Sequence, residues 1–208
     1  LNFMLLKEAV ENVSGKDMDT YLKENFYRKL GANTTTFLPI EHNIPVSRIS
    51  PTENDPFFRK QHLRGYVHDE GAALFGGISG NAGLFSNAND LAKLYQMWLN
   101  GGEYGGERFL SKETVKVFTA TKSSTSRRTP IEVYGHTGYT GTSFWVDPTH
   151  DMIYIFLSNR VNPSRSPNRL SSLNIRERIQ EELYHALDHR GAGNINNPNH
   201  RFKIQDSK

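Results

Sequence analysis

The chain contains no cysteine, and that absence excludes several kinds of site. No disulfide bond, thiolate zinc site or cysteine nucleophile can form. No apolar run approaches the roughly 18 residues of a membrane-spanning helix, and no signal-peptide pattern is visible. Lysine and arginine (25) nearly balance aspartate and glutamate (22), which leaves a net charge of +3. That excess is too small and too dispersed to indicate a nucleic-acid partner.

The length and composition are those of a soluble globular protein with one ordinary domain, or one and a half small ones. With 208 residues, 36% hydrophobic and 23% charged, the chain is long enough to bury a core. The first residue is Leu1 rather than methionine, and it already lies inside a helical pattern, so we expect a piece of a longer polypeptide. Residues 1–190 are predicted to form the folded part. Residues 191–208, rich in Asn, Pro and Gly, are predicted to be a flexible tail.

Apolar residues at helical spacing predict five helices, most of them bounded by capping or stop residues. They span about residues 1–14, 17–30, 88–100, 111–120 and 170–188. Asn87 fits an N-cap with Asp90 three positions later. Residues 32–65 contain four prolines and are predicted to be irregular, and the glycine-rich stretch 65–83 is predicted to be a loop.

The last third of the chain changes to a strand pattern. Strands are predicted at 131–137, 140–147 and 152–159, after a polar linker at 121–130. The run "MIYIFLSN" is continuously apolar, so we expect the third strand to be the most buried. The turn "DPTHD" predicts an antiparallel hairpin between the last two strands. Helices followed by an antiparallel sheet and a terminal helix indicate an α+β fold.

One stretch of the strand region is unusually rich in glycine and hydroxyl groups. It reads "YGHTGYTGTSFWVDP", residues 134–148. Glycine weakens a strand interior, so its repetition marks a bulge or a close approach to the backbone. Taken alone, His136-Thr137-Gly138 is a weak motif, and its glycines could be simple bulges.

Three stretches in a fixed order carry a family resemblance: "GNAGLFSNANDLAKLYQMWLNGG", "YGHTGYTGTSFWVDP" and "IYIFLSNR". Together they resemble the serine β-lactamase and penicillin-binding protein family, closest to its class C-like branch of D-alanyl-D-alanine carboxypeptidases and esterases. The stretch "VSGKDMDTYLKENFYRKLGANTT" is similar to a helical part of that branch. The resemblance covers about residues 1–187 and implies part of a β-lactamase/transpeptidase-like fold, an antiparallel sheet flanked by helices.

The resemblance implies roles for four residues on the glycine-rich strand. His136-Thr137-Gly138 matches the family's Lys-Thr-Gly or His-Thr-Gly motif. His136 and Thr137 would hold a substrate carboxylate and tune proton transfer. The backbone N–H of Tyr139, beside the uncovered backbone at Gly138, would be one of two donors to the carbonyl oxygen that gains negative charge.

The other two motifs of the family are absent from the chain. No serine has a lysine three positions later, and no tyrosine has an asparagine two positions later. The Ser-x-x-Lys nucleophile and the Tyr-x-Asn motif therefore either lie upstream of Leu1, which we expect, or the chain is an inactive relative. A family strand between residues 119 and 133 is also missing, so we expect residues to be absent near Arg128–Pro130.

Several other residues could carry chemistry. His68, Asp69 and Glu70 resemble a metal cluster, but metal sites usually draw on separated ligands. By resemblance Asp69 could line the substrate pocket, although it could equally hold its own turn. Ser79 and Asn81 in the glycine-rich loop are further pocket candidates. That loop lacks the Lys-Ser/Thr of a nucleotide-binding loop, so no cofactor and no metal are predicted.

Two functions are compatible with these residues. The first is the C-terminal part of a serine acyl hydrolase acting on a β-lactam, a D-Ala-D-Ala peptide of peptidoglycan or a small ester. It would be completed by the N-terminal part of the same domain and would work in the bacterial periplasm or cell envelope. The second is a non-catalytic binding module on the same fold. The isolated chain is predicted to be inactive because it lacks the nucleophile.

Overall fold

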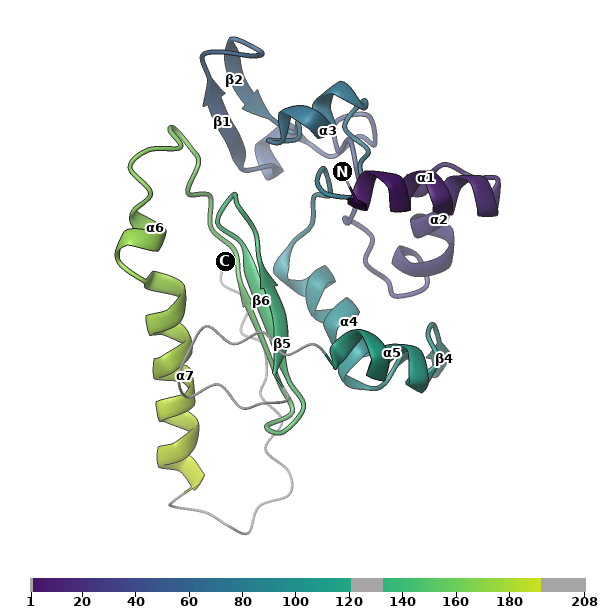
Figure 1. Cartoon of the computed structure of the whole chain (residues 1–208), viewed down its shortest axis with the longest axis vertical. Coiled ribbons are helices and arrows are strands. Elements are labelled where there is room, and N and C mark those ends of the chain that lie inside the picture. The colour runs from purple at the N-terminus through teal and green to yellow at the C-terminus, as the bar shows by residue number, and fades with distance from the viewer. Residues whose placement is uncertain (1, 121–132, 192–208) are drawn as a thin grey trace.

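The computed structural model describes residues 2–120 and 133–191, with side chains as far as residue 187. The predicted linker at 121–130, the start of the first predicted strand, the expected gap near Arg128–Pro130 and the predicted tail beyond Gly191 lie outside the described residues. Within them, a three-stranded sheet lies between the long helix α7 (Ile175–Gly191) and α4 (Ala88–Leu99); the other helices of residues 2–120 lie on the α4 side, and the short helix that precedes α7 lies on the α7 side (Figure 1).

The predicted helices form, with changes at their ends. α1 spans Asn2–Ser14, α4 spans Ala88–Leu99, and α5 spans Lys112–Thr119 behind its Ser111 cap. The Asn87 side chain accepts the N–H of Asp90 at 2.9 Å, as the sequence predicts. The second helix is instead divided into α2 (Met18–Leu22) and a π-helical segment η1 (Lys23–Tyr27).

The sheet has the order β5-β6-β7, and both pairs of strands are antiparallel. β5 spans Tyr134–Thr137, β6 spans Ser143–Asp147, and β7 spans Met152–Phe156. On the α7 face, Trp145 packs with Val133 and Tyr184 in a buried cluster. On the opposite face, the Phe144 ring stacks on Tyr95 of α4 with centroids 4.0 Å apart. The predicted antiparallel hairpin and the α+β class are confirmed.

The prediction that the third strand is the most buried is wrong. Every residue of β7 is only partly buried, whereas four of the five residues of β6 are buried. The reason is topological, because β6 has a strand on each side and β7 has a neighbour on one side only in the described sheet. A continuous apolar run does not distinguish these two situations.

Two regions predicted to be irregular contain regular elements. β1 (Pro51–Asp55) and β2 (Gln61–Arg64) pair as an antiparallel hairpin, preceded by the short 3₁₀ turn η2 (Val46–Arg48). Pro51 begins its strand and Pro56 follows it, so neither proline interrupts the ladder. The glycine-rich loop contains α3 (Glu70–Leu74), whose first turn is capped by Asp69.

Two short elements also differ from the predicted pattern. A two-residue ladder joins β3 (Glu103–Tyr104) to β4 (Glu107–Arg108), which the sequence reading missed. The terminal helix is broken into α6 (Arg169–Ser172) and α7, because Asn174 has a φ of +48°. Asparagine tolerates that left-handed conformation better than most residues.

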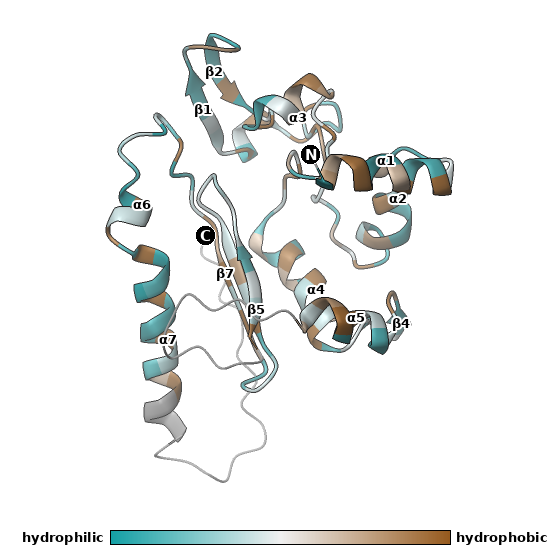
Figure 2. Ribbon diagram, in the orientation of Figure 1, coloured by the Kyte–Doolittle hydropathy of each residue, from teal (hydrophilic) through white to brown (hydrophobic). Residues whose placement is uncertain are grey.

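The apolar stripe of α1 is exposed. No residue of this helix is buried, and the ribbon of α1 includes hydrophobic segments near the N-terminal end (Figure 2). Its large exposed apolar side chains are Phe3, Leu5, Leu6, Val10 and Val13. In the described structure this amphipathic helix therefore presents to solvent the face that its pattern would bury.

Candidate active site

The strand that carries the His-Thr-Gly motif ends in a tight turn. The Gly138 N–H donates to the Thr142 carbonyl at 2.7 Å, and the Gly141 N–H donates to the Gly138 carbonyl at 3.1 Å. Gly141 has a φ of +120°, and a Cβ there would lie 2.5 Å from the Ser158 hydroxyl. Glycine at 141 is therefore required both by backbone conformation and by the close approach of the segment after β7.

Gly135 is required by close contact within the sheet. A Cβ at this position would lie 2.1 Å from the Phe144 carbonyl oxygen and 2.6 Å from the Trp145 ring. Both neighbours belong to β6, so a larger residue could not be accommodated without moving the strand that positions the motif. Packing between neighbouring strands thus explains why position 135 has a glycine, as the sequence pattern predicts for a close approach to the backbone.

The first two motif residues lie on opposite faces of β5. His136 is exposed and is paired with Phe144, whose ring stacks on Tyr95 of α4. Thr137 is paired with Ser143 and is only partly exposed. Successive side chains of a strand alternate between its faces, so His136 is on the α4 face and Thr137 on the α7 face.

Tyr139 lies between two other side chains just beyond the motif. Tyr139 is 62% exposed. The Arg160 guanidinium lies 4.0 Å from the centroid of the Tyr139 ring, and the centroid of the His68 ring lies 5.4 Å from it. The Nε of Arg160 also donates to the Tyr139 carbonyl at 2.7 Å. The Tyr139 N–H has no acceptor among the described residues. A donor of this kind could interact with an external carbonyl oxygen.

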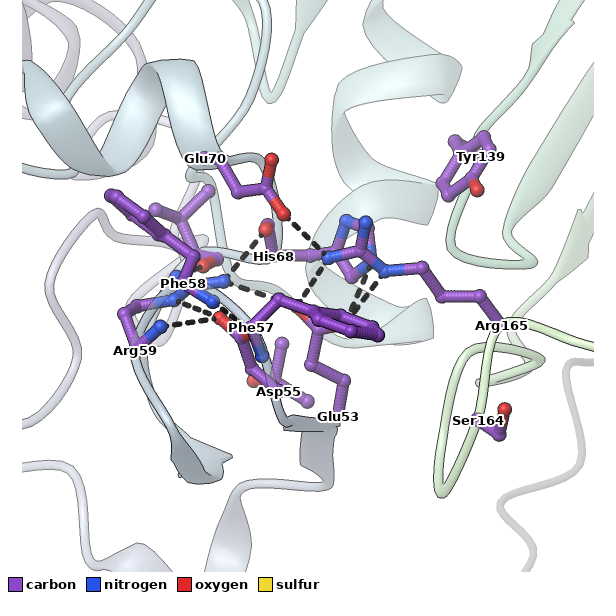
Figure 3. Close-up of polar contacts among 12 residues, drawn as sticks. Glu53, Asp55, Phe57, Phe58, Arg59, His68, Glu70, Tyr139, Ser164 and Arg165 are labelled. Atoms are coloured by element: carbon purple, nitrogen blue, oxygen red, sulfur yellow. Dashed lines mark hydrogen bonds and ion pairs between the residues drawn. The ribbon is translucent and has the colours of Figure 1, made fainter.

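An ionic cluster lies beside Tyr139, and its members come from distant segments (Figure 3). Glu53 of β1, 1% exposed, accepts hydrogen bonds from Arg59 at 3.0 Å and from the Nε of Arg165 at 2.9 Å. The His68 Nε2 lies 3.3 Å from the Glu53 carboxylate but is not aligned for a hydrogen bond. Burial lowers the pKa of His68, and the positive charges of Arg165 and Arg59 add to this effect, while Glu53 opposes it.

Asp55 holds the turn that follows β1. Its carboxylate accepts the backbone N–H groups of residues 57, 58 and 59 and the Nε of Arg59, all at about 3.0 Å. Burial alone would raise the pKa of Asp55, but these donors together hold it well below its ordinary value. Asp55 thereby fixes Arg59, which in turn reaches Glu53 and the carbonyls of Val67 and His68.

The three predicted pocket residues have local partners. The Asp69 carboxylate accepts the Ala72 N–H at 2.7 Å and caps α3, which agrees with the alternative that it holds its own turn. The Ser79 hydroxyl donates to the Asn81 side chain at 2.7 Å. No hydrogen bond joins any of the three to residues 136–139 in the described part of the chain. Their role in a substrate pocket stays a prediction.

The adjacent residues His68, Asp69 and Glu70 diverge rather than converge. His68 faces Tyr139, Asp69 caps α3, and Glu70 accepts a hydrogen bond from Arg165 at 3.0 Å. Across residues 2–120 and 133–187, no three histidine, aspartate or glutamate side chains gather in a way that could hold a metal ion. Over the same described residues, no helix combines the length and the apolar character that crossing a membrane requires.

The described residues contain no assembled nucleophile of the expected kind. None of the hydrogen bonds in residues 2–120 and 133–187 joins a serine hydroxyl to a lysine amino group. Sequence reasoning found the motif residues but missed His68, Glu53 and Arg165 as their neighbours. His68 is a sequence candidate only as part of the group His68, Asp69 and Glu70, and no sequence signal identifies Glu53 or Arg165, because these residues become neighbours only through folding.

Comparison with known proteins decides the family. A family model described as Beta-lactamase matches residues 1–175, which include the whole segment 134–148. The chain belongs to the beta-lactamase family. The predicted resemblance to serine β-lactamases and penicillin-binding proteins, and the predicted fold class, are therefore confirmed.

The relatives of this beta-lactamase-family chain carry a more specific name. A protein of Escherichia coli K12 named "Putative D-alanyl-D-alanine carboxypeptidase" is 36% identical over 207 aligned residues, which cover 83% of the chain and 48% of the relative. A protein of the same name from Salmonella gallinarum is 33% identical, and the alignment covers 81% of the chain and 47% of that relative. The chain thus spans about half the length of the curated relatives it matches.

A solved structure supports the fold alone. The octameric penicillin-binding protein homologue from Pyrococcus abyssi is 18% identical, with a TM-score of 0.50. The match covers 82% of this chain and 40% of that chain. The sheet and flanking helices described above therefore correspond to part of a known larger fold.

Proposed function

We propose that this chain is the C-terminal part of a serine acyl hydrolase and that residues 136–139 form one wall of its active site. The single observation that carries the proposal is that the Tyr139 N–H, at the end of the motif strand in a beta-lactamase-family chain, has no acceptor among the described residues. In the proposed parent polypeptide, a segment that precedes Leu1 supplies the Ser-x-x-Lys nucleophile and the Tyr-x-Asn motif.

The proposed reaction has two steps. The serine oxygen bonds to the substrate carbonyl carbon while its proton passes to a neighbouring base, and the carbonyl oxygen becomes negatively charged. The Tyr139 N–H and a second backbone donor stabilise that oxygen. The tetrahedral species then collapses to an acyl-enzyme, and the amine or alcohol takes up a proton and departs; in a β-lactam the protonated amine stays attached to the acyl group, because the bond that breaks is part of a ring. Water attacks this ester, releases the acid and restores the serine.

Exposed His136 and the neighbouring Thr137 are proposed to contact the substrate. An imidazole can bind a carboxylate when protonated and can exchange a proton near neutral pH. We propose β-lactams, D-Ala-D-Ala peptides of peptidoglycan or small esters as substrates, in the bacterial periplasm or cell envelope. The carboxypeptidase name of the curated relatives supports the peptide substrate among these.

A covalent-labelling experiment tests the proposal. The parent polypeptide is incubated with a fluorescent penicillin and with an activated ester, and the adduct is measured by mass spectrometry. We expect a stable acyl adduct on a serine upstream of Leu1, and none on the isolated 208-residue chain. If the parent forms no adduct with either reagent, the non-catalytic binding module is the correct alternative.

Two variants at one position isolate the proposed donor. Tyr139→Pro removes the backbone N–H, whereas Tyr139→Ala keeps it and removes the same exposed ring. In a serine protease, the loss of one oxyanion-hole donor lowers kcat by about 100- to 1,000-fold. We expect a loss of this size for Y139P and a much smaller one for Y139A. Equal losses in the two variants would mean that the ring, and not the N–H, supports the reaction.

A further inference from the structure

Arg176 of α7 reaches across to the turn that follows the motif strand. Its Nη2 donates to the Gly138 carbonyl at 2.8 Å and to the Thr142 carbonyl at 3.0 Å. These two carbonyls flank the turn, and the Gly138 carbonyl also accepts the Gly141 N–H. One guanidinium nitrogen thus connects the two ends of the turn to the helix beneath it.

The position of Arg176 is energetically unfavourable for a charged side chain. Arg176 is partly buried, and its Nε is buried without a hydrogen-bond partner among the described residues. No carboxylate lies within 4.0 Å of its guanidinium in residues 2–120 and 133–187. Burial lowers the pKa of Arg176, with the Glu177 carboxylate opposing that effect. A half-buried cation without an ion-pair partner is costly, so stability from a salt bridge does not explain its presence.

The bond to Gly138 determines the direction of the Tyr139 N–H. The Gly138 carbonyl and the Tyr139 N–H belong to one trans peptide, whose atoms lie in a plane with the C=O and N–H pointing in opposite directions. Because the carbonyl points to Arg176, the N–H points away from it. The next carbonyl, that of Tyr139, is held by the Nε of Arg160 at 2.7 Å. Two arginines from different segments therefore restrain the peptide that contains this N–H and the peptide that follows it.

We propose that Arg176 is a positioning residue that orients the Gly138–Tyr139 peptide, so that its N–H is presented to the substrate carbonyl. This inference rests on the proposed function, since it assigns the N–H a substrate. Arg176 does not touch the substrate in this role. Instead, it prevents rotation of the peptide plane, which would turn the N–H away from the developing negative charge.

Kinetics on the parent polypeptide test the role. Arg176→Met removes both hydrogen bonds and keeps an unbranched but shorter side chain, and Arg176→Lys keeps one donor nitrogen. Arg178→Met, on an exposed arginine of the same helix, is the matched control. We expect R176M to lower kcat for a chromogenic ester by about 10- to 100-fold, with KM changed much less. R176K should recover part of the loss, and R178M should behave like the unmodified protein.

A second measurement does not depend on activity. The ¹³C shift of the Gly138 carbonyl and the amide shift of Tyr139 are recorded by NMR for the unmodified protein and the three variants. We expect both to change in R176M and to stay unchanged in R178M. If the unmodified parent proves inactive, the proposed function fails and these shifts still decide the positioning role. Unchanged shifts in R176M, or an unchanged kcat in an active parent, would overturn the inference.

Discussion

The Nε of Arg165 donates to the Oε2 of Glu53 at 2.9 Å, across 112 positions of sequence. The bond joins the segment after β7 to the hairpin β1–β2, and it lies beside His68, which contacts the Tyr139 ring. The surroundings of the proposed oxyanion donor therefore depend on an ionic cluster built from three separate parts of the chain (Figure 3).

Glu53→Gln should destabilise the fold strongly. The substitution removes the only carboxylate charge that Arg59 and Arg165 share in this cluster, and Glu53 is 1% exposed. Breaking a buried ion pair from one side costs about 3 kcal/mol or more where it leaves a charge without a partner. Arg59 keeps Asp55 and Arg165 keeps Glu70, so we expect a loss of about 2 kcal/mol. The free energy of unfolding in urea measures the effect. The control is Glu103→Gln at an exposed pair with Arg108, where we expect a loss below about 1 kcal/mol. Similar losses in both variants would contradict this account.

Asp55→Asn should change how stability depends on acid. The folded-state pKa of Asp55 lies below its ordinary value, near 3.9 in an unfolded chain. Its contribution is therefore fully present above that pH and is lost as the pH falls toward the lower folded pKa. We expect the stability difference between the unmodified chain and D55N to be large at pH 7 and to shrink between about pH 4 and pH 2. Thermal midpoints across this range measure it.

The control for Asp55 is Asp151→Asn, at an exposed aspartate without a hydrogen bond in the described part of the chain. D151N removes a carboxylate while leaving the turn after β1 intact. A stability difference for D55N that stays constant across the acid range would show that its carboxylate does not contribute through its charge.

Tyr184→Phe should remove a buried hydrogen bond beneath the sheet. The Tyr184 hydroxyl donates to the Asp147 carboxylate at 2.7 Å, and burial together with this bond raises the pKa of Tyr184. Hydrogen bonds to charged groups contribute about 1.5 to 3 kcal/mol, so we expect a loss of that order in the free energy of unfolding. Tyr66→Phe is the control, because Tyr66 is exposed and its hydroxyl has no partner among the described residues. An equal effect at both positions would contradict the prediction.

Gly135→Ala should disturb the motif strand itself. The added Cβ would lie 2.1 Å from the Phe144 carbonyl oxygen, so β5 would have to move away from β6. Gly105→Ala is the comparison, because a Cβ there meets nothing within 4 Å and costs only the strain of a φ of +60°, about 1 kcal/mol. We expect G135A to be clearly less stable than G105A, and to lose penicillin labelling in the parent polypeptide. Equal stability would mean that the strand tolerates a side chain at this position.

Local sequence patterns correctly predict the helices that begin at a clear capping residue. Asn87 and Ser111 each bond the N–H three residues later, as their sequence context predicts, because capping involves only neighbouring residues. The same locality explains the missed hairpin β1–β2. Its prolines suggested irregular chain, and only the pairing with Gln61–Arg64 reveals a strand.

The candidate site divides in the same way. His136, Thr137, Gly138 and Tyr139 are predicted from a contiguous motif and its family resemblance, and their roles stay predictions. The contacts of Arg160 and Arg176 with backbone carbonyls of this segment could not be predicted from sequence. An arginine next to a strand or on a terminal helix is an ordinary surface residue until folding brings it to a particular carbonyl.

By itself, the sequence determined the α+β class, the family, most helices and the position of the motif, since each depends on periodicity or on residues close along the chain. Only the tertiary structure decided that β6 rather than β7 is the buried strand, that Glu53 collects two arginines, and that Arg176 holds the Gly138 carbonyl. These features are contacts between segments tens of residues apart. The energies of these contacts depend on burial and orientation, and neither can be predicted from neighbouring residues in the sequence.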